Sequence, residues 1–204
     1  MGLQTEITKD LLTIEAVQIR THDYFTWTSG IKSPIYCDNR LTMSYPEVRT
    51  KIAQAFAELI EKFNWQPENI AGCATAGIPH AAWLAERLKL PMVYVRSSPK
   101  GHGKGNQIEG HVKPGQKIVV IEDLISTGGS SLEAAQVLQQ EGADVLSVLA
   151  IFTYGLPKAQ QTFEEADIPF TTITGFDDLL EALKDKEDIT EAEHQELLSW
   201  RNHL

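Results

Sequence analysis

The sequence predicts an α/β fold: a mostly parallel, twisted sheet flanked by helices, with a helix and a flap at its N-terminal end. From residue 70 onward, short apolar runs alternate with segments of helical periodicity, the pattern of a parallel sheet covered on both faces. The chain has 204 residues, which is enough for one domain with small additions. Hydrophobic residues make up 42% and charged residues 23%, as in ordinary globular proteins. We therefore expect a single domain over residues 1–204.

The composition narrows the classes of function and compartment. The formal net charge of -10 argues against a surface covered by nucleic acid, although it leaves room for a local basic loop. Cys37 and Cys73 lie far apart and form no CxxC motif, which favours a reducing compartment and no structural zinc. Residues 1–20 mix charges with short apolar pairs, so we expect no signal peptide, and no apolar run approaches a membrane span in length. The expectation is a cytoplasmic protein.

The N-terminal part is expected to form a helix, an extended flap and a second helix. An imperfect apolar stripe predicts the first helix over residues 3–20. The stretch "FTWTSGIKSPIYCDNR" (25–40) alternates aromatic and polar residues around Ser29-Gly30, which favours a hairpin or flap. Pro46 opens the second helix, since proline is tolerated in a first helical turn. Apolar residues recur down one side of that helix: Val48, Ile52, Phe56, Leu59, Ile60 and Phe63.

Strands and helices alternate through the rest of the chain. Strands are predicted over residues 70–74, 91–95, 117–125, 144–154 and 170–174. Helices are predicted from Pro79, over 130–141 and over 158–166, and two more are expected near the C-terminus. Residues 96–110 lack periodicity and are rich in glycine and basic groups, which indicates a long functional loop. We divide the domain into a flap region (1–45), a core (46–175) and C-terminal helices (176–204).

A phosphate site is predicted in "KIVVIEDLISTGGSS", residues 117–131. The loop Ser126-Thr127-Gly128-Gly129-Ser130 lies between a strand and a helix, so its glycines can turn successive amide N–H groups inward. The start of the following helix adds unpaired N–H groups and a positive dipole end. The loop lacks the lysine of a P-loop and does not match GxGxxG. It suits the phosphate of a monoester.

Two acids, Glu122 and Asp123, end the apolar strand just before this loop. Buried carboxylates are costly, so their presence at this place requires a reason. They can accept hydrogen bonds from a ribose diol and orient a hydrated Mg²⁺, which takes oxygen ligands. A lone acidic pair would more often be an ordinary strand end whose acids cap the next helix. The whole string "VVIEDLISTGGS" favours a ribose-5-phosphate site.

This string resembles the phosphoribosyl-diphosphate (PRPP) signature of the type I phosphoribosyltransferases. The flap, "ATAGIPHAAWLA" and "YVRSSPKGHGKGNQIEGHV" are similar to segments of the orotate phosphoribosyltransferases within that family, and the likeness covers about three-quarters of the chain. The resemblance implies the type I phosphoribosyltransferase fold, with the N-terminal region as a hood over the base. It also implies Mg-dependent transfer of 5-phosphoribose from PRPP to orotate. The products would be orotidine 5′-monophosphate and pyrophosphate, in de novo UMP biosynthesis.

The resemblance also assigns the site residues. Lys100, His102 and Asp123 are implied as catalytic, and Ser126 as a contact to orotate. Arg96, Lys100 and His102 would reach PRPP across the interface of a homodimer with shared active sites. Mg²⁺ would bind through PRPP and water near Glu122 and Asp123 rather than directly to side chains. The implied PRPP-binding residues are Thr75, Ala76, Gly77, Arg96, Lys100, His102, Glu122, Asp123, Leu124, Ile125, Ser126, Thr127, Gly128, Gly129 and Ser130.

The basic loop can be interpreted in two ways. Four cations or potential cations, Arg96, Lys100, His102 and Lys104, lie close together in an acidic protein. Most such clusters are solvated surface loops. Together with the signature, this one is interpreted as a glycine-rich clamp that closes over pyrophosphate, stabilises its developing charge and excludes water.

Recognition of the base is the least specified part of the prediction. Phe25, Trp27 and Tyr36 could cover the pyrimidine ring, although aromatic residues are more often simple packing. Some family members hold orotate with an arginine after the strand that ends near residue 154, and residues 154–170 contain none. The orotate carboxylate would then meet backbone groups, Lys32 or Arg40, and both cations could equally be surface charges.

Other departures from the family pattern lie in the turn, the loop and the flap. Ala76, Ser97 and Thr28 occupy places where some members carry lysine. Two other functions compete with the orotate enzyme: a phosphoribosyltransferase for a purine base, and a PRPP-sensing regulator that binds without catalysis. The net charge of -10 argues against the regulator, which would need a nucleic-acid surface.

Overall fold

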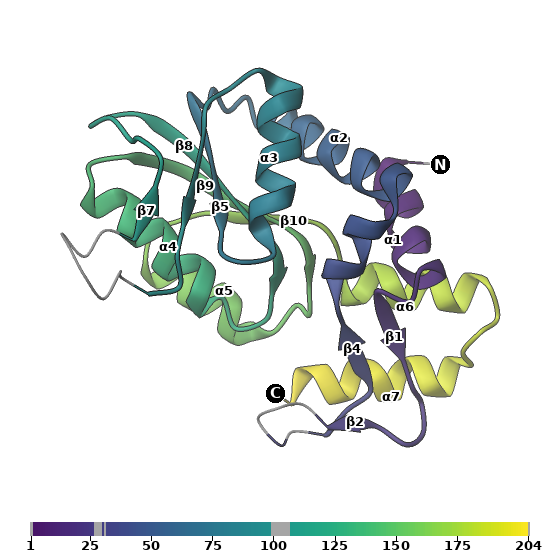
Figure 1. The fold of residues 1–204 in the computed structure, drawn as a ribbon. Coiled ribbons are helices and arrows are strands. Elements are labelled where there is room, and N and C mark those ends of the chain that lie inside the picture. Colours follow the sequence, from purple (N-terminus) through teal and green to yellow (C-terminus); the bar gives the residue numbers. More distant parts are fainter. Residues whose placement is uncertain (1, 27–29, 31, 99–106, 204) are drawn as a thin grey trace.

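The computed structural model describes residues 2–26, 30, 32–98 and 107–203 (Figure 1). Its centre is a six-stranded sheet in the order β10-β9-β8-β5-β6-β7. All neighbouring pairs are parallel except β6 and β7, which are antiparallel. The strands are β5 (Asn69–Cys73), β6 (Met92–Val95), β7 (Ile108–Glu109), β8 (Lys117–Ile125), β9 (Asp144–Thr153) and β10 (Phe170–Gly175). The predicted mostly parallel sheet is confirmed.

Helices cover both faces of the sheet because successive side chains of the buried strands point to opposite sides. On β8, Val119 and Ile121 join the apolar cluster that contains α1 (Leu3–Thr13), α2 (Pro46–Lys62) and α3 (Gly77–Leu88). Ile118 and Val120 join the second cluster, under α4 (Gly129–Gln140) and α5 (Pro157–Glu165). The continuous apolar run of β8 is therefore explained by burial on both faces.

The flap lies beside the C-terminal helices, beyond the carboxyl ends of the strands (Figure 1). Its four short strands pair antiparallel, β1 (Val17–Ile19) with β4 (Ile35–Cys37) and β2 (Phe25–Thr26) with β3 (Lys32–Ser33). A 3₁₀ helix, η1 (Asn39–Ser44), leads from the flap to α2. The chain ends with α6 (Phe176–Asp185) and α7 (Glu191–Asn202).

Hydrogen bonds join α7 to the flap. The Tyr24 hydroxyl lies 3.1 Å from Oε1 of Glu196, and Trp200 Nε1 donates to the carbonyl oxygen of Lys32 at 3.2 Å. The flap and the last helix are therefore held together beyond the same edge of the sheet. Within the described ranges, no helix is long and apolar enough to cross a membrane.

Three predicted element boundaries are wrong. The first helix ends at Thr13 rather than residue 20: Glu15 adopts a left-handed φ of 58°, and β1 begins at Val17. The β-branched residues there pair with the flap instead, with Ile19 opposite Ile35. Helix α3 begins at Gly77, two residues before Pro79. The predicted loop 96–110 includes the short strand β7.

Candidate active site

Of the predicted loop of residues 126–130, residues 126–128 lie between β8 and α4, whereas Gly129 and Ser130 already form the start of the helix. Gly128 precedes the helix with a φ of 86°, and a Cβ atom there would lie 2.8 Å from Cε2 of Phe163. Only glycine therefore fits this position. The Gly128 carbonyl oxygen accepts from the Leu132 N–H at 2.9 Å and from the Ser131 hydroxyl at 3.2 Å. With no acidic residue in the first turn of α4, its free N–H groups make an electropositive cradle.

Glu122 and Asp123 lie near the carboxyl end of β8, which ends at the buried Ile125. Oε1 of Glu122 accepts a hydrogen bond from the Asp123 N–H at 2.9 Å. Burial raises the pKa of Glu122 well above its usual range, and the neighbouring Asp123 carboxylate raises it further. The folded state therefore binds this proton more tightly than the unfolded chain does. As pH rises from the ordinary carboxyl range toward the raised pKa, Glu122 ionises in the unfolded chain but keeps its proton in the folded protein. The free energy of unfolding therefore falls over this range.

A turn at residues 74–77, called here the pyrophosphate turn, contains the implied PRPP-binding residues Thr75, Ala76 and Gly77, and it packs directly against β8 beside Glu122. Its peptide bond between Ala74 and Thr75 is cis, and the Ala74 N–H donates to the Val95 carbonyl oxygen at 2.9 Å. A Cβ atom on Gly77 would lie 2.3 Å from the Ile121 carbonyl oxygen and 3.2 Å from Cα of Glu122. The absence of a side chain at Gly77 is what lets the turn come this close to β8.

Arg96 lies at the end of β6, where the basic loop begins. Its N–H donates to the Gln107 carbonyl oxygen at 2.8 Å, and its Nη1 lies 3.5 Å from Oε1 of Glu109. A cavity of about 50 Å³ joins it to the pyrophosphate turn and to α4; the lining includes Ala74, Arg96 and Ser130. The structure thus brings together Arg96, the turn and the phosphate loop. The predicted catalytic residues Lys100 and His102 lie outside the described residues.

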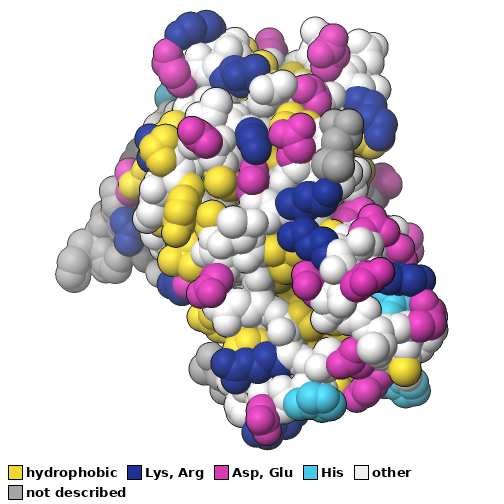
Figure 2. Space-filling view, turned by 90° about the vertical axis from the view of Figure 1, so that its right-hand side faces the viewer, with side chains coloured by type: hydrophobic (Ala, Val, Ile, Leu, Met, Phe, Trp, Pro, Cys, Tyr) yellow, Lys and Arg dark blue, Asp and Glu magenta, His cyan; other side chains and the backbone are white. Residues whose placement is uncertain are grey.

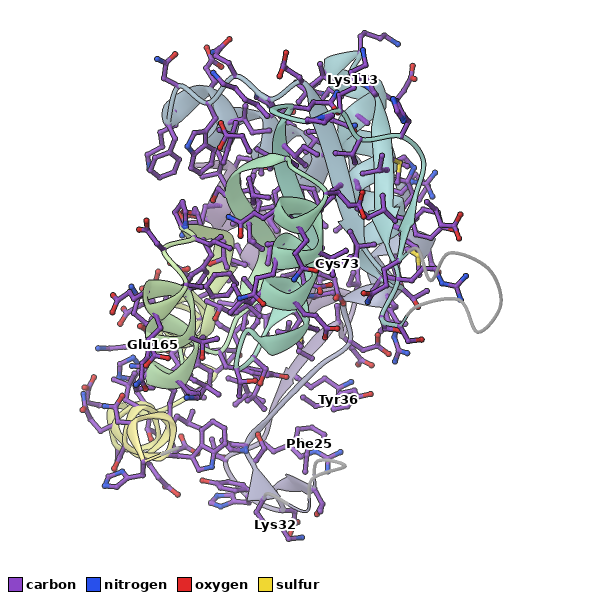
Figure 3. All side chains as sticks on the ribbon, turned by 90° about the vertical axis from the view of Figure 1, so that its left-hand side faces the viewer. Phe25, Lys32, Tyr36, Cys73, Lys113 and Glu165 are labelled. Atoms are coloured by element: carbon purple, nitrogen blue, oxygen red, sulfur yellow. The ribbon has the colours of Figure 1, made fainter. Side chains whose placement is uncertain are left out.

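The flap presents aromatic rings toward the strand ends. Figure 3 shows Phe25 and Tyr36 between the flap and the strand end that carries Cys73, and their ring centroids are 5.7 Å apart. The side chain of Tyr36 remains 40% exposed, so the ring is open to a ligand. Tyr154, directly after β9, is buried near Cys37, Tyr36 and Asp123, and burial raises the pKa of its hydroxyl. Trp27, the third aromatic residue predicted here, lies outside the described residues.

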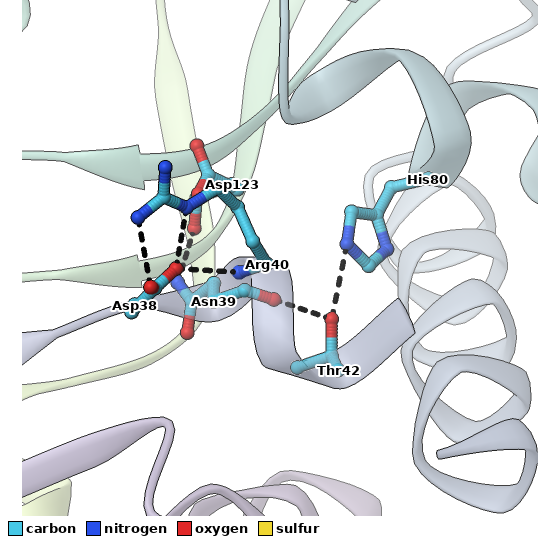
Figure 4. A network of polar contacts seen from close by, with 6 residues as sticks. All are labelled: Asp38, Asn39, Arg40, Thr42, His80 and Asp123. Atoms are coloured by element: carbon cyan, nitrogen blue, oxygen red, sulfur yellow. Dashed lines mark hydrogen bonds and ion pairs between the residues drawn. The ribbon is translucent and has the colours of Figure 1, made fainter. Parts of the chain in front are cut away.

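Sequence reasoning missed a polar network that joins the flap to β8 and α3 (Figure 4). Buried Asn39 donates from Nδ2 to the main-chain carbonyl oxygen of Asp123 at 2.7 Å. The main-chain carbonyl oxygen of Asn39 accepts from the Thr42 hydroxyl at 2.6 Å. The Thr42 hydroxyl also lies 3.3 Å from Nε2 of His80, whose pKa is lowered to about 4 by burial. His80 is therefore neutral at physiological pH. The only sequence signal for Asn39 is a polar residue at the end of an aromatic flap.

The two cations predicted to meet the base occupy different places. The Arg40 guanidinium binds both carboxylate oxygens of Asp38, with Nε–Oδ1 at 2.6 Å and Nη2–Oδ2 at 2.8 Å (Figure 4). Lys32 lies at the outer end of the flap, away from the strand ends (Figure 3). Arg40 is thus the closer of the two to the acid pair.

The donor set near the phosphate loop suits a hydrated divalent cation. Among the residues that the structure describes, no group of three or more His, Cys, Asp or Glu side chains could enclose a metal ion. Glu122 and Asp123 supply oxygen ligands of the kind that Mg²⁺ prefers, and Mg²⁺ usually keeps several waters and binds substrate phosphates. These two residues therefore fit contacts, made through water, to a metal ion that is bound by the phosphates of the substrate.

Comparison with known proteins gives the family. Residues 44–168 match the phosphoribosyl transferase domain. The chain is 60% identical over 202 residues to the orotate phosphoribosyltransferase of Oceanobacillus iheyensis, covering 99% of this chain and 100% of that one. It is 56% identical over 204 residues to the enzyme of the same name from Fusobacterium nucleatum, covering 99% and 97%.

Solved structures agree with the fold. The crystal structure of orotate phosphoribosyltransferase from Aeropyrum pernix matches with a TM-score of 0.77 and 27% identity, over 90% of this chain and 99% of that one. The structure of Leishmania donovani UMP synthase matches with a TM-score of 0.81 and 26% identity, over 100% of this chain and 43% of that one. The predicted type I phosphoribosyltransferase fold is confirmed, and the chain belongs to the orotate phosphoribosyltransferase family.

Proposed function

We propose that the chain transfers 5-phosphoribose from PRPP to N1 of orotate, with Mg²⁺, in de novo UMP biosynthesis in the cytoplasm. The products are orotidine 5′-monophosphate and pyrophosphate. One observation carries the proposal: the phosphate loop, the acid pair and the turn at residues 74–77 meet at one edge of the sheet, in a chain 60% identical to an orotate phosphoribosyltransferase. Ligands of such sheets bind at the carboxyl ends of the strands.

Each part of the site takes one part of PRPP. The loop 126–130 and the start of α4 hold the 5-phosphate. Glu122 and Asp123 accept hydrogen bonds from the ribose diol, and Asp123, the more exposed of the two, lies near ribose C1. Main-chain N–H groups of the turn, with Arg96, hold the pyrophosphate. Mg²⁺, when bound with the substrate, adds positive charge to the leaving group.

The reaction exchanges one bond at ribose C1 for another. The C1–O bond to pyrophosphate breaks and its electron pair leaves with the pyrophosphate, so positive charge develops on the ribose. The nearby Asp123 carboxylate stabilises this charge, because it is fixed in place before the reaction begins. Orotate carries its charge on the C6 carboxylate, and N1 still holds a proton. N1 forms the new bond to ribose C1 and its proton passes to an oxygen of the departing pyrophosphate, so the step needs no dedicated side-chain base.

The base is held between the flap and the strand ends. Phe25 and Tyr36 offer ring faces on the flap side, and Ser126 offers a hydroxyl on the loop side. This placement brings N1 toward Asp123 and C1.

We expect the purified protein, with PRPP, orotate and Mg²⁺, to lower the orotate absorbance, and removal of the metal by a chelator to stop the reaction. Adding Mg²⁺ back should restore it, since the pyrophosphate would again leave with its charge neutralised. Adenine, hypoxanthine and guanine serve as controls and should give no product. Turnover of a purine base but not orotate would contradict the proposal, and so would undiminished activity in excess chelator.

The regulator alternative has little support. On the face that carries the N-terminus and α1, acidic and basic side chains are interspersed rather than gathered by sign (Figure 2). A regulator that reads nucleic acid would need a basic surface, and the net charge is -10.

We also propose that the active sites are shared within a homodimer, with the basic loop of one subunit serving the site of its partner. Lys100→Ala and Asp123→Asn should then each be nearly inactive. After subunit exchange the mixture should recover up to about one quarter of wild-type activity, because half the dimers are mixed and each mixed dimer holds one intact site. Mass photometry with differently tagged subunits verifies the exchange. Verified mixed dimers without recovered activity would show that each loop serves its own subunit.

A further inference from the structure

We infer that Arg40 binds the carboxylate of orotate and that Asp38 orients it for this task. The inference rests on the proposed function and deepens it, because it names the residue that distinguishes orotate from a pyrimidine without the acid group.

The chemistry of orotate restricts where such a cation can lie. The carboxylate is attached to C6, the ring atom next to N1, and N1 must reach ribose C1. The carboxylate therefore lies close to the reacting bond, near Asp123 rather than at the outer end of the flap. An anion placed beside the Asp123 carboxylate needs a cation to offset their repulsion.

Arg40 has the right position. It lies three residues after the end of the flap strand β4, in the first turn of η1, and Figure 4 shows its guanidinium beside Asp123. Tyr36 and Asp123 both contribute to a raised pKa of Arg40, after the larger effect of its hydrogen bonds to Asp38. The guanidinium is thus near both Tyr36 of the flap and Asp123.

Arg40 also has unused donors. A guanidinium has five N–H groups in a fixed fork. Asp38 takes one edge of this fork, through Nε and Nη2. Nη1 has no hydrogen-bond partner among the described residues, and the side chain is 64% exposed. Because Asp38 holds one edge in place, the other edge is presented to a ligand at little cost in conformational entropy.

The neighbouring cations are less suitable. Lys32 is exposed at the outer end of the flap (Figure 3). Arg20 lies 4.1 Å from the centroid of Phe25, against its ring, where it supports the flap. Arg201 is only 14% exposed, and its Nη1 is 2.8 Å from Oδ1 of Asp177.

The test compares the binding of two nucleotides that differ only in the carboxylate, orotidine 5′-monophosphate and UMP, by calorimetry. Wild type should bind orotidine 5′-monophosphate more tightly. Arg40→Met should lower that affinity about 10- to 100-fold, as expected for a charge-assisted bidentate contact, and leave the affinity for UMP nearly unchanged. Asp38→Asn should give a smaller loss of the same preference, and Arg40→Lys should keep part of it, because it retains the charge without the fork.

Two arginine variants complete the design. Arg87→Met, on the last turn of α3, removes a distant guanidinium and should behave as wild type. Arg201→Met removes a second arginine that is paired with an aspartate. A preference that survives in Arg40→Met, or that is lost in Arg201→Met instead, overturns the inference and leaves the proposed function standing. A wild type that binds both nucleotides equally also overturns the inference, whereas the proposed function is overturned only by failure of the orotate assay. If Arg40→Met does not fold, as judged by thermal melting, Arg40→Lys and Asp38→Asn decide the matter by the same comparison.

Discussion

Replacing Asp123 by asparagine is expected to lower kcat by about 10²- to 10³-fold, the usual cost of removing one fixed electrostatic group from a transition state. The fold should survive, because the hydrogen bond that β8 receives from Asn39 goes to the main-chain oxygen of Asp123 and not to its side chain. The stability should even rise slightly. Asp123 helps to raise the pKa of Glu122, so removing its charge makes ionised Glu122 less costly. Steady-state kinetics and thermal melting at the same pH measure both effects.

Asp144→Asn is the matched control for this change. Asp144 begins β9 beside Lys117, at the opposite end of the sheet from Glu122, and it is exposed. Its replacement should leave kcat unchanged. If Asp123→Asn kept full activity, the carboxylate would have no part in the reaction and the proposed mechanism would be wrong.

Gly77→Ala is expected to lower the free energy of unfolding by about 2–4 kcal/mol, as severe overpacking against a rigid group does. The added methyl would meet a strand carbonyl oxygen at 2.3 Å, and a main-chain atom cannot rotate away as a side chain can. The amino end of α3 must then withdraw from β8, which also moves the turn away from Glu122. Denaturant unfolding measures the loss, and PRPP affinity should fall in parallel.

Gly129→Ala provides the contrast, because nothing lies within 4 Å of the Cβ position at Gly129. Its stability should be equal to or slightly above that of wild type, since alanine restricts the unfolded chain. Equal melting of the two variants would mean that the close approach of Gly77 to β8 does not hold in solution.

The parts of the fold that depend on local pattern were predictable from the sequence. The apolar run before Glu122 predicted β8, and Gly128 and Gly129 predicted the turn from β8 into α4, because burial on both faces and tight turns each restrict residue type locally. The helix from Pro46 was likewise predicted by its proline and its apolar stripe, and it is confirmed as α2.

The wrong boundaries depend on partners that are distant in sequence. Val17 and Ile19 continue an apolar stripe, and only the pairing with residues 35–37 turns that segment into a strand. The two-residue strand β7 exists because Tyr94 and Val95 lie opposite it, and a strand this short has no period of its own. When a strand forms only by pairing with a distant segment, its own sequence has no pattern from which the strand could be predicted.

The candidate site also has one part that the sequence indicates directly and another that depends on residues distant in the sequence. The phosphate loop and the acids form one continuous stretch, so the sequence indicates them directly. Asn39 and Tyr154 come from the flap and from the end of β9, and they reach Asp123 only after the flap has folded over the strands. Their types, a buried amide and a buried phenol, suit many positions in a protein, so their role could not be assigned before their neighbours were known.

The hydrogen bond from Trp200 to the flap also gives the protein an optical signal of its own. Indole emission changes in wavelength and intensity when its N–H loses a partner or meets water, and here the partner is the main chain of Lys32. Any movement of β3 away from α7 must alter that environment. The last helix therefore carries a natural fluorophore that would report such a movement without a label, once the other three tryptophans, Trp27, Trp65 and Trp83, are replaced.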